Sequence, residues 1–196
     1  MNDVRARGRQ QLLLLAALFF APLLAAVVLY FFFPGFVPEG HTNYGELVDP
    51  ARPIPQASLR DDAGADAGAG ALRGKWSFVY VGNGACDAAC AAKLHQIRQV
   101  RTLLNEKRLR VQRVYIAADP AELASVRAQL QAEHADLHYF ADTPDAAYRR
   151  FFGAQDPQAL YLVDPLGNWL MVYPAAAGPK GILGDIKKLL RISQIG

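Results

Sequence analysis

The sequence predicts an α/β domain, with a central mixed sheet and flanking helices, behind one N-terminal transmembrane helix. Two observations favour this class. Residues 12–33 form an apolar run that only Pro22 interrupts. After residue 74, short stretches of β-branched and aromatic residues alternate with stretches of helical periodicity, which is typical of a sheet with helical crossovers. The 196 residues leave room for one ordinary domain and an appendage.

The apolar run is long enough to cross a bilayer, because a helix over 12–33 reaches about 33 Å and a hydrocarbon core is about 30 Å thick. Arg5, Arg7 and Arg9 precede the run and no basic cluster follows it, so we expect the N-terminus to be cytoplasmic. A cleaved signal peptide, the alternative, has a shorter apolar core and a small-residue cleavage site. The sequence therefore predicts an uncleaved single-pass anchor of the inner membrane, with residues 1–11 cytoplasmic and the following domain periplasmic.

The charge pattern argues against a nucleic-acid partner. The first ten residues carry a net charge of +2, which leaves only +1 of the total +3 for the rest of the chain. A protein that binds phosphate backbones needs a clustered basic face, and the linear sequence shows none. The membrane and other proteins are thus the expected partners.

Residues 34–73 are predicted to be a linker. They are rich in glycine and alanine, especially over 63–71, and such a segment buries little apolar surface. We expect one short extended piece, over 54–59, to dock on the domain. The segment also contains five prolines: Pro34, Pro38, Pro50, Pro53 and Pro55.

The first half of the predicted domain, residues 74–196, alternates strands and helices. Residues 76–81 and 111–116 are apolar and β-branched and predict strands. A helix is expected to begin at Asp119, because Pro120 and a first-turn acid, Glu122, follow this N-cap residue. Between the strands, helical spacing predicts a long amphipathic helix over 87–106, whose apolar stripe is Cys90, Leu94, Ile97, Val100 and Leu104.

The second half predicts one more parallel crossover, then a hairpin and a helix. A strand over 137–140 is followed by a short helix that Thr143 and Pro144 open and Gly153 closes. Strands over 160–163 and 169–172 flank a turn sequence, and a last amphipathic helix covers 182–192. Parallel crossovers first and a hairpin and helix last are the layout of a thioredoxin-like domain.

The two cysteines are expected to work as a pair. Two are too few for a disulfide framework or a four-thiolate zinc site. Cys86 and Cys90 are separated by one helical turn, so their Cα atoms lie about 6 Å apart, which a disulfide tolerates. Closing so short a loop stabilises a fold by only about 2 kcal/mol. A redox couple or a metal clamp is therefore favoured over a purely structural bridge.

The cysteines follow the strand Trp76–Val81 and precede the stretch Tyr161–Gly167, and together these segments resemble the Sco/SenC proteins of cytochrome oxidase assembly over roughly 74–196. The resemblance implies a thioredoxin-like fold in which Cys86 and Cys90 either hold copper with a distant histidine or reduce the copper-site cysteines of the oxidase. Copper is the one cofactor that it implies.

The position of the family's copper histidine is Asp156 in this sequence, and a carboxylate is a hard ligand beside two soft thiolates. The four histidines, His41, His95, His134 and His138, lie in the linker, on a helix face and around a strand, and none is expected to replace it. Thioredoxin-like folds place a cis-proline opposite the cysteines, and Pro157 is the candidate. Asp156 and Pro157 are thus expected to line the site, with Asp156 either solvated or accepting a proton during exchange.

Three functions follow as hypotheses. The leading one is a membrane-anchored thiol-disulfide protein that keeps the copper-site cysteines of a respiratory oxidase subunit, or of another periplasmic thiol protein, reduced. In it, Cys86, expected to be the more exposed thiol, attacks and Cys90 resolves the mixed disulfide. The second is a Cu(I) carrier that uses the same two thiolates. The third is a non-catalytic interaction module with a locked disulfide.

Overall fold

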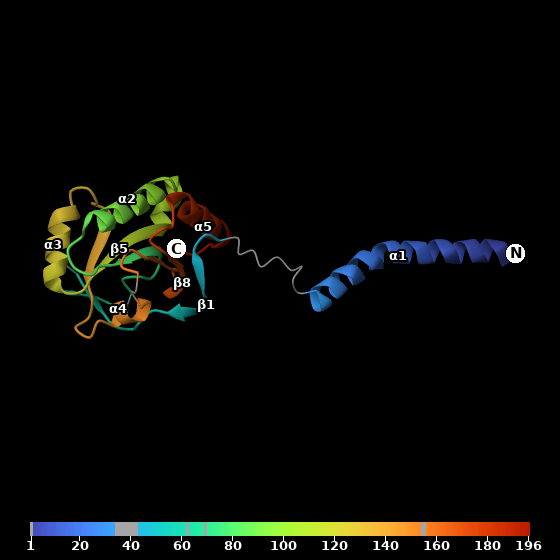
Figure 1. Ribbon diagram of the computed structural model, residues 1–196, viewed down its shortest axis with the longest axis horizontal. Coiled ribbons are helices and arrows are strands. Elements are labelled where there is room, and N and C mark those ends of the chain that lie inside the picture. The colour runs from blue at the N-terminus through green and yellow to red at the C-terminus, as the bar shows by residue number, and fades with distance from the viewer. Residues whose placement is uncertain (1, 34–42, 62, 69, 154–155) are drawn as a thin grey trace. The chain divides into compact units, whose positions relative to one another are not determined.

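The computed structural model describes residues 2–33, 43–61, 63–68, 70–153 and 156–196. It divides the chain into two units, Met1–Thr42 and Asn43–Gly196 (Figure 1). In the first unit the described residues form one helix. The second unit carries the sheet, the remaining helices and both cysteines.

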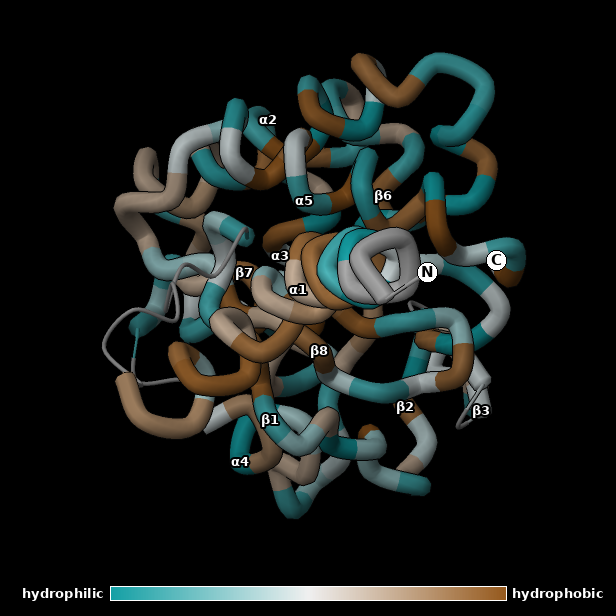
Figure 2. Tube along the Cα trace, turned by 90° about the vertical axis from the view of Figure 1, so that its right-hand side faces the viewer, coloured by the Kyte–Doolittle hydropathy of each residue, from teal (hydrophilic) through white to brown (hydrophobic). Residues whose placement is uncertain are grey.

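Helix α1 (Asn2–Phe32) is the membrane anchor. Its stretch Arg7–Phe32 is long and apolar enough to cross a bilayer. The helix begins ten residues before the predicted start of the span, at 12, because arginine and glutamine are good helix formers and continue it toward the N-terminus. Figure 2 shows this helix end-on, with hydrophilic turns near the N-terminus and hydrophobic turns behind them.

The second unit is built on one eight-stranded mixed sheet in the order β1-β8-β7-β4-β5-β6-β2-β3. The parallel pairs are β4 with β5 and β5 with β6, and all other pairs are antiparallel. The predicted central mixed sheet is confirmed. Its strands are β1 (Glu46–Pro53), β2 (Leu59–Arg60), β3 (Asp66–Gly68), β4 (Trp76–Val81), β5 (Val111–Ala117), β6 (Leu137–Ala141), β7 (Leu160–Val163) and β8 (Asn168–Tyr173).

Helices cover both faces of this sheet (Figure 1). Helices α2 (Ala88–Thr102), α3 (Pro120–Leu130) and α5 (Pro179–Ile192) pack on one face, and α4 (Ala147–Phe152) packs on the other. Strand β4 is buried along its whole length because both faces are covered. Its side chains alternate between the two cores, with Phe78 and Tyr80 on the α2 side and Val79 on the α4 side.

The predicted linker over 34–73 is wrong from residue 43 onward, where the chain joins the folded unit; residues 34–42 lie outside the described residues. Strands β1 and β3 form the two edges of the sheet, and neither has a buried residue. Edge strands tolerate proline and polar residues, so their composition resembles that of a linker. The expected docking of 54–59 is confirmed, since Ile54 and Leu59 are buried.

The ends of three predicted helices differ from those observed. Helix α2 ends at Thr102, and a 3-10 helix, η2 (Asn105–Arg110), replaces its predicted last turn. Helix α4 starts at Ala147 rather than at Thr143, and the Asp142 carboxylate accepts hydrogen bonds from the backbone N–H groups of its first turn. Helix α5 starts at Pro179, three residues earlier than predicted, since proline suits the first turn of a helix.

A buried ion pair fixes helix α2 to the sheet. Arg113 on β5 is fully buried and forms an ion pair with the Asp136 carboxylate, while its Nη1 donates to the Leu94 carbonyl of α2 over 3.2 Å. Arg101 of α2 donates to the same carboxylate over 2.9 Å. The side chain of His134 is also buried there, with its Nδ1 3.3 Å from the Arg113 guanidinium. Two cations from two elements thus share one carboxylate behind the helix that carries Cys90.

Candidate functional site

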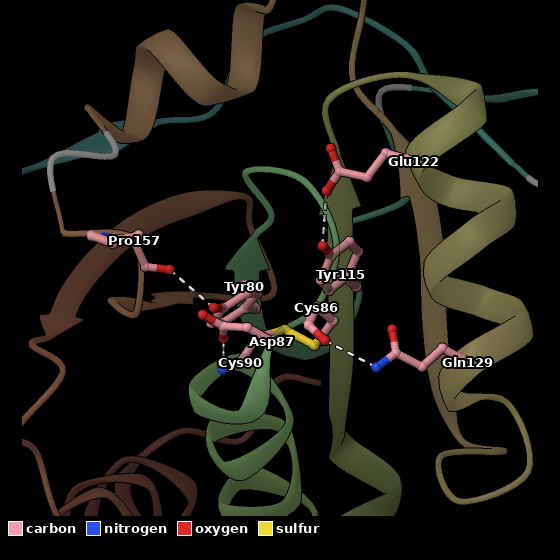
Figure 3. Close-up of a disulfide and its surroundings, with 8 residues drawn as sticks. All are labelled: Tyr80, Cys86, Asp87, Cys90, Tyr115, Glu122, Gln129 and Pro157. Atoms are coloured by element: carbon pink, nitrogen blue, oxygen red, sulfur yellow. Dashed lines mark hydrogen bonds between the residues drawn. A yellow bond between two sulfur atoms is a disulfide. The ribbon is translucent and has the colours of Figure 1, made fainter.

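Cys86 and Cys90 form a disulfide with a Cα to Cα distance of 5.2 Å. Cys90 lies in the first turn of α2, and Cys86 lies in the loop that joins β4 to this helix. The expectation that sequence spacing brings the two sulfur atoms together is confirmed. The pair thus lies at the connection between a parallel strand, β4, and the crossover helix that follows it, α2 (Figure 3).

The disulfide is less exposed than expected. Cys86 is 4% exposed and Cys90 is 5% exposed, so the expectation that Cys86 is the more exposed thiol is wrong. Both cysteines belong to the core between the sheet and α2. Their neighbours Ala85, Asp87 and Ala88 are exposed. The pair therefore lies directly beneath a surface of short side chains.

A carboxylate occupies the N-terminus of α2. Asp87 is the N-cap residue, and its Oδ1 accepts a hydrogen bond from the Cys90 N–H over 2.8 Å. The unpaired amides of a helix N-terminus favour a nearby anion, and here Asp87 supplies that anion itself. Its charge opposes formation of a second anion on either sulfur. The stabilisation that a helix N-terminus ordinarily gives a thiolate is therefore offset.

Tyr80 connects the disulfide region to the loop before β7. Its hydroxyl donates to the Pro157 carbonyl over 2.9 Å (Figure 3). Burial, together with the negative charges of Asp87, Asp156 and Glu122, raises the pKa of Tyr80 to about 12, so the hydroxyl remains a donor at neutral pH. Three carboxylates from three segments are thus close enough to act on one phenol beside the disulfide.

Asp156 holds this loop in place. Its Oδ1 accepts from the N–H of Gln158 over 3.0 Å, and its Oδ2 accepts from the N–H of Ala175 over 2.8 Å. Lys93 of α2 donates to the carbonyl of Ala175 over 2.9 Å. Burial lowers the pKa of Lys93, and the charge of Asp156 works in the opposite direction. Asp156 is therefore a partly exposed side chain that accepts two backbone hydrogen bonds and fixes this loop.

The predicted cis-proline at Pro157 is wrong. Among the described residues the one cis peptide bond is Asp49-Pro50, so the bond before Pro157 is trans. Its carbonyl nevertheless reaches the site through Tyr80, as described above. That Asp156 and Pro157 line the active site stays a prediction, now supported by their contacts with Tyr80 and with the loop at Ala175.

A buried carboxylate that contacts Tyr115 could not be predicted from the sequence. The Glu122 side chain is 8% exposed, and it accepts from the Tyr115 hydroxyl over 2.9 Å and from the Ala118 N–H over 3.0 Å. Tyr115 stacks on Tyr80 with ring centroids 5.7 Å apart, and it lies between Cys86 and Glu122 in Figure 3. Helix periodicity identifies Glu122 only as a first-turn acid, because its contact with Tyr115 depends on how α3 packs on β5.

Gly82 makes room for this buried pair. A Cβ atom at this position would lie 2.0 Å from the Tyr115 hydroxyl and 2.4 Å from Oε1 of Glu122. The Gly82 carbonyl accepts from Arg149 Nη2 over 2.6 Å, and the same guanidinium lies 4.0 Å from the Glu122 carboxylate. On the other side of the disulfide, Gln129 of α3 donates to the Cys86 carbonyl over 2.9 Å. The loop that carries Cys86 is thus fixed at both ends.

The residues present do not fit a copper site of three protein ligands. No group of three or more histidine, cysteine, aspartate or glutamate side chains in the described part of the chain could hold a metal. His95 pairs with Glu133 at 3.0 Å on the surface, His134 contacts Arg113, and His138 is exposed on β6. Asp156 already accepts two backbone hydrogen bonds, as described above. His41 lies outside the described residues.

We expect the Asp87→Asn protein, once reduced, to react with iodoacetamide about twofold faster than the wild type at neutral pH. Asparagine still caps the helix, but loss of the negative charge increases the thiolate fraction, an effect that a lower intrinsic nucleophilicity partly offsets. The matched control is Asp119→Asn, since Asp119 caps α3 in the same way without a cysteine on its helix. Equal rates for the wild type and the Asp87 variant would show that this charge does not act on the sulfur atoms.

Comparisons with known proteins agree with this geometry. A model of the family described as transmembrane-like, thioredoxin-like, C-terminal domain matches residues 76–193. A model described as transmembrane-like, N-terminal domain matches residues 2–32. No curated protein matches the chain.

Among solved structures, the fold is similar to that of apo Sco1 from Thermus thermophilus, with a TM-score of 0.64 and 18% identity over 77% of this chain and 99% of that chain. Copper-bound ScoI from Arabidopsis thaliana gives a TM-score of 0.59 and 20% identity over 73% and 99%. A disulfide switch has been identified in BsSco, a member of the Sco family of cytochrome c oxidase assembly proteins. Its structure gives a TM-score of 0.56 and 15% identity over 76% of this chain and 99% of that chain. These likenesses confirm the predicted thioredoxin-like fold.

Proposed function

The chain belongs to the transmembrane-like, thioredoxin-like family, and from this premise we propose that it is a membrane-anchored thiol-disulfide protein that reduces a cysteine pair in a partner protein. The anchor and the thioredoxin-like fold are established above. The direction of electron flow, the identity of the partner and the side of the membrane on which the folded unit lies are proposed below.

The proposed reaction starts from the reduced protein. The Cys86 thiolate attacks one sulfur of a partner disulfide, and the other partner sulfur leaves as a thiolate and takes up a proton. Cys90 then loses its proton and attacks the Cys86 sulfur, so the second partner thiol leaves and the Cys86–Cys90 disulfide re-forms. Two electrons pass to the partner, and the two protons lost by the cysteines match the two it gains. A dithiol donor protein must reduce the pair again before another turnover.

The observation that carries the proposal is the carboxylate at the helix start. A thiol-disulfide protein becomes a strong oxidant when its reduced, thiolate form is stabilised. Here Asp87 is bonded to the Cys90 N–H and lowers the stability of a thiolate at that end of α2. Asp156 and Glu122 add negative charge around Tyr80. An acidic site disfavours the reduced thiolate, which supports a reductant rather than an oxidant.

The buried position of the pair defines how a partner gains access. The partner must approach the exposed residues Ala85, Asp87 and Ala88 that cover the cysteines. Gly84, two residues before Cys86, has a φ of 125°, a conformation that favours glycine, and an added Cβ there would contact nothing within 4 Å. We propose that the hydrogen bond from Gln129 to the Cys86 carbonyl breaks and that this loop then shifts locally to present the Cys86 sulfur, since Cys90 is held by the helix.

The resemblance to Sco/SenC proteins supports a respiratory oxidase subunit as the partner, with the cysteines of its copper site as the disulfide that is reduced. Three arginines before the span support a cytoplasmic N-terminus and a folded unit on the periplasmic side of the inner membrane. That side is oxidising, so a pair of metal-binding cysteines there needs a reductant before it can bind copper.

The test measures reduction of a peptide disulfide, with three residues between its cysteines, by the pre-reduced full chain in detergent. We expect one peptide to be reduced per protein and a midpoint potential below about −200 mV, in the range of reducing thioredoxin-like proteins. Cys86→Ser should lower the rate by at least about 100-fold, because a serine hydroxyl cannot replace the thiolate. No reduction of the peptide, or a potential well above this value, would contradict the proposal.

Two further measurements on the full chain test the copper-carrier and interaction-module hypotheses. Titration of the reduced chain with Cu(I) against a competing chelator is expected to show no tight one-to-one complex, since both sulfur atoms are covered and the Asp87 carboxylate opposes further negative charge beside them. Tight binding that Cys86→Ser abolishes would instead support the copper carrier. A disulfide that resists excess dithiothreitol would support the interaction module.

A further inference from the structure

Four basic side chains gather around one surface hollow between η2 and α5. The hollow has a volume of about 840 Å³ and is lined by Lys107, Lys187, Lys188 and Arg191. All four are exposed, and Glu106 is the one acid in the lining. An exposed apolar side chain, Leu103, lies in the same lining. We call these lining residues the basic hollow.

The basic hollow has a net positive charge, whereas the rest of the chain after residue 10 has a net negative charge. Its four cations and one carboxylate carry a net charge of +3, whereas the whole chain after residue 10 carries only +1. The remainder of that stretch is therefore net negative. The dipole of α5 accounts for a cation in its last turn, such as Arg191, but not for Lys107 of η2. Such an accumulation attracts an anionic surface.

The chain enters the folded unit beside this hollow. The Asp185 carboxylate of α5 is buried and accepts from the backbone N–H groups of Tyr44 and Gly45, each at 2.9 Å. Tyr44 covers Gly181, where an added Cβ would lie 2.8 Å from its side chain, and a Cβ added at Gly184 would lie 3.8 Å from its ring. Gly184 also lines the basic hollow. The first residues of the folded unit are thus fixed to the helix that carries the hollow.

Covalent geometry then limits the distance from the anchor. Ten Cα to Cα steps separate Phe33, directly after α1, from Asn43, and an extended chain covers at most about 36 Å over that length. This bound is comparable to the thickness of one bilayer. Asn43 can therefore lie no farther than about 36 Å from the end of α1, so a lipid surface is within reach of the folded unit.

We propose that the basic hollow binds the headgroups of anionic phospholipids in the membrane that α1 spans. Lysine and arginine near an anionic membrane surface each contribute favourably, and the exposed Leu103 suits the boundary between headgroups and acyl chains. An acidic protein is the other occupant that the charge would suit. The short connection to the anchor favours lipid, because lipid is always within reach.

The test uses the full chain in nanodiscs of phosphatidylcholine, with or without phosphatidylglycerol, and follows amide hydrogen exchange of η2 and α5. We expect the anionic lipid to slow exchange in these two elements by at least about fivefold, the effect of one basic residue at such a surface, and high salt to reverse the slowing. The Lys187→Gln, Arg191→Gln protein should lose the protection.

The matched control is Arg60→Gln, Arg150→Gln, which removes two exposed cations from β2 and α4. This protein should retain the protection, because its changes leave the basic hollow intact. Equal exchange in the two lipid compositions, or equal protection in both double variants, would overturn the proposal. Neither result depends on the redox chemistry of the cysteines.

Discussion

The Cys90→Ser full-length protein is expected to accumulate as a mixed disulfide with its partner when it is expressed in membranes that contain that partner. Without the Cys90 sulfur, the bond between Cys86 and the partner cannot be resolved from within the protein. Cys90 is the resolving residue in this scheme because α2 fixes it, and its N–H is bonded to Asp87. Non-reducing electrophoresis after acid quenching measures the adduct.

The matched control for trapping is Cys86→Ser, which keeps one cysteine and leaves it in the helix. We expect its adduct to be at least about tenfold less abundant, since Cys90 lies within the first turn of α2 and cannot move out to the partner as the loop residue can. If Cys86→Ser traps the partner and Cys90→Ser does not, the order of attack is reversed. If neither variant traps any partner, the exchange reaction itself is contradicted.

Asp136→Ala is expected to lower the free energy of unfolding by about 3 kcal/mol, near the lower end for breaking a buried ion pair. The lower end applies because the Asp136 side chain is 37% exposed, whereas the Arg113 side chain that it neutralises is fully buried. The substitution leaves the Arg113 charge inside the protein without its partner. Thermal unfolding of the full chain in detergent, followed by tryptophan fluorescence, measures the change.

This ion pair also predicts how stability depends on pH. Burial alone would raise the pKa of Asp136, but the hydrogen bond from Arg113 and the charges of Arg113 and Arg101 hold it below its ordinary value of 3.8. Its contribution is therefore complete above pH 3.8 and is lost as the pH falls through the lowered pKa. The wild type should lose stability over that window, and Asp136→Ala should lose less.

The control is Asp145→Ala, which removes an exposed ion pair with Arg150 in which each side chain is 67% exposed. Such a pair contributes at most about 1 kcal/mol, so the unfolding midpoint should hardly move. Equal destabilisation by the two variants would show that the burial of Arg113 does not decide the strength of the Asp136 pair.

Much of the fold could be predicted because its local patterns are strong. The strand Trp76–Val81 reads as a continuous apolar run because both faces of the sheet are covered around it. The N-cap at Asp119 is visible in the chain because capping depends on neighbouring residues. Strands β1 and β3 were not predictable in this way, since edge strands carry neither an alternating pattern nor an apolar run.

By itself, the sequence determined the membrane anchor, the thioredoxin-like succession of elements and the cysteine pair, because each depends on spacing within a few residues of the chain. Only the tertiary structure decided that both sulfur atoms are covered, that Glu122 is buried against Tyr115, and that four cations from η2 and α5 share one hollow. Burial and charge density depend on which distant segments pack together, and residues such as Lys107 and Arg191 become neighbours only when the two elements meet.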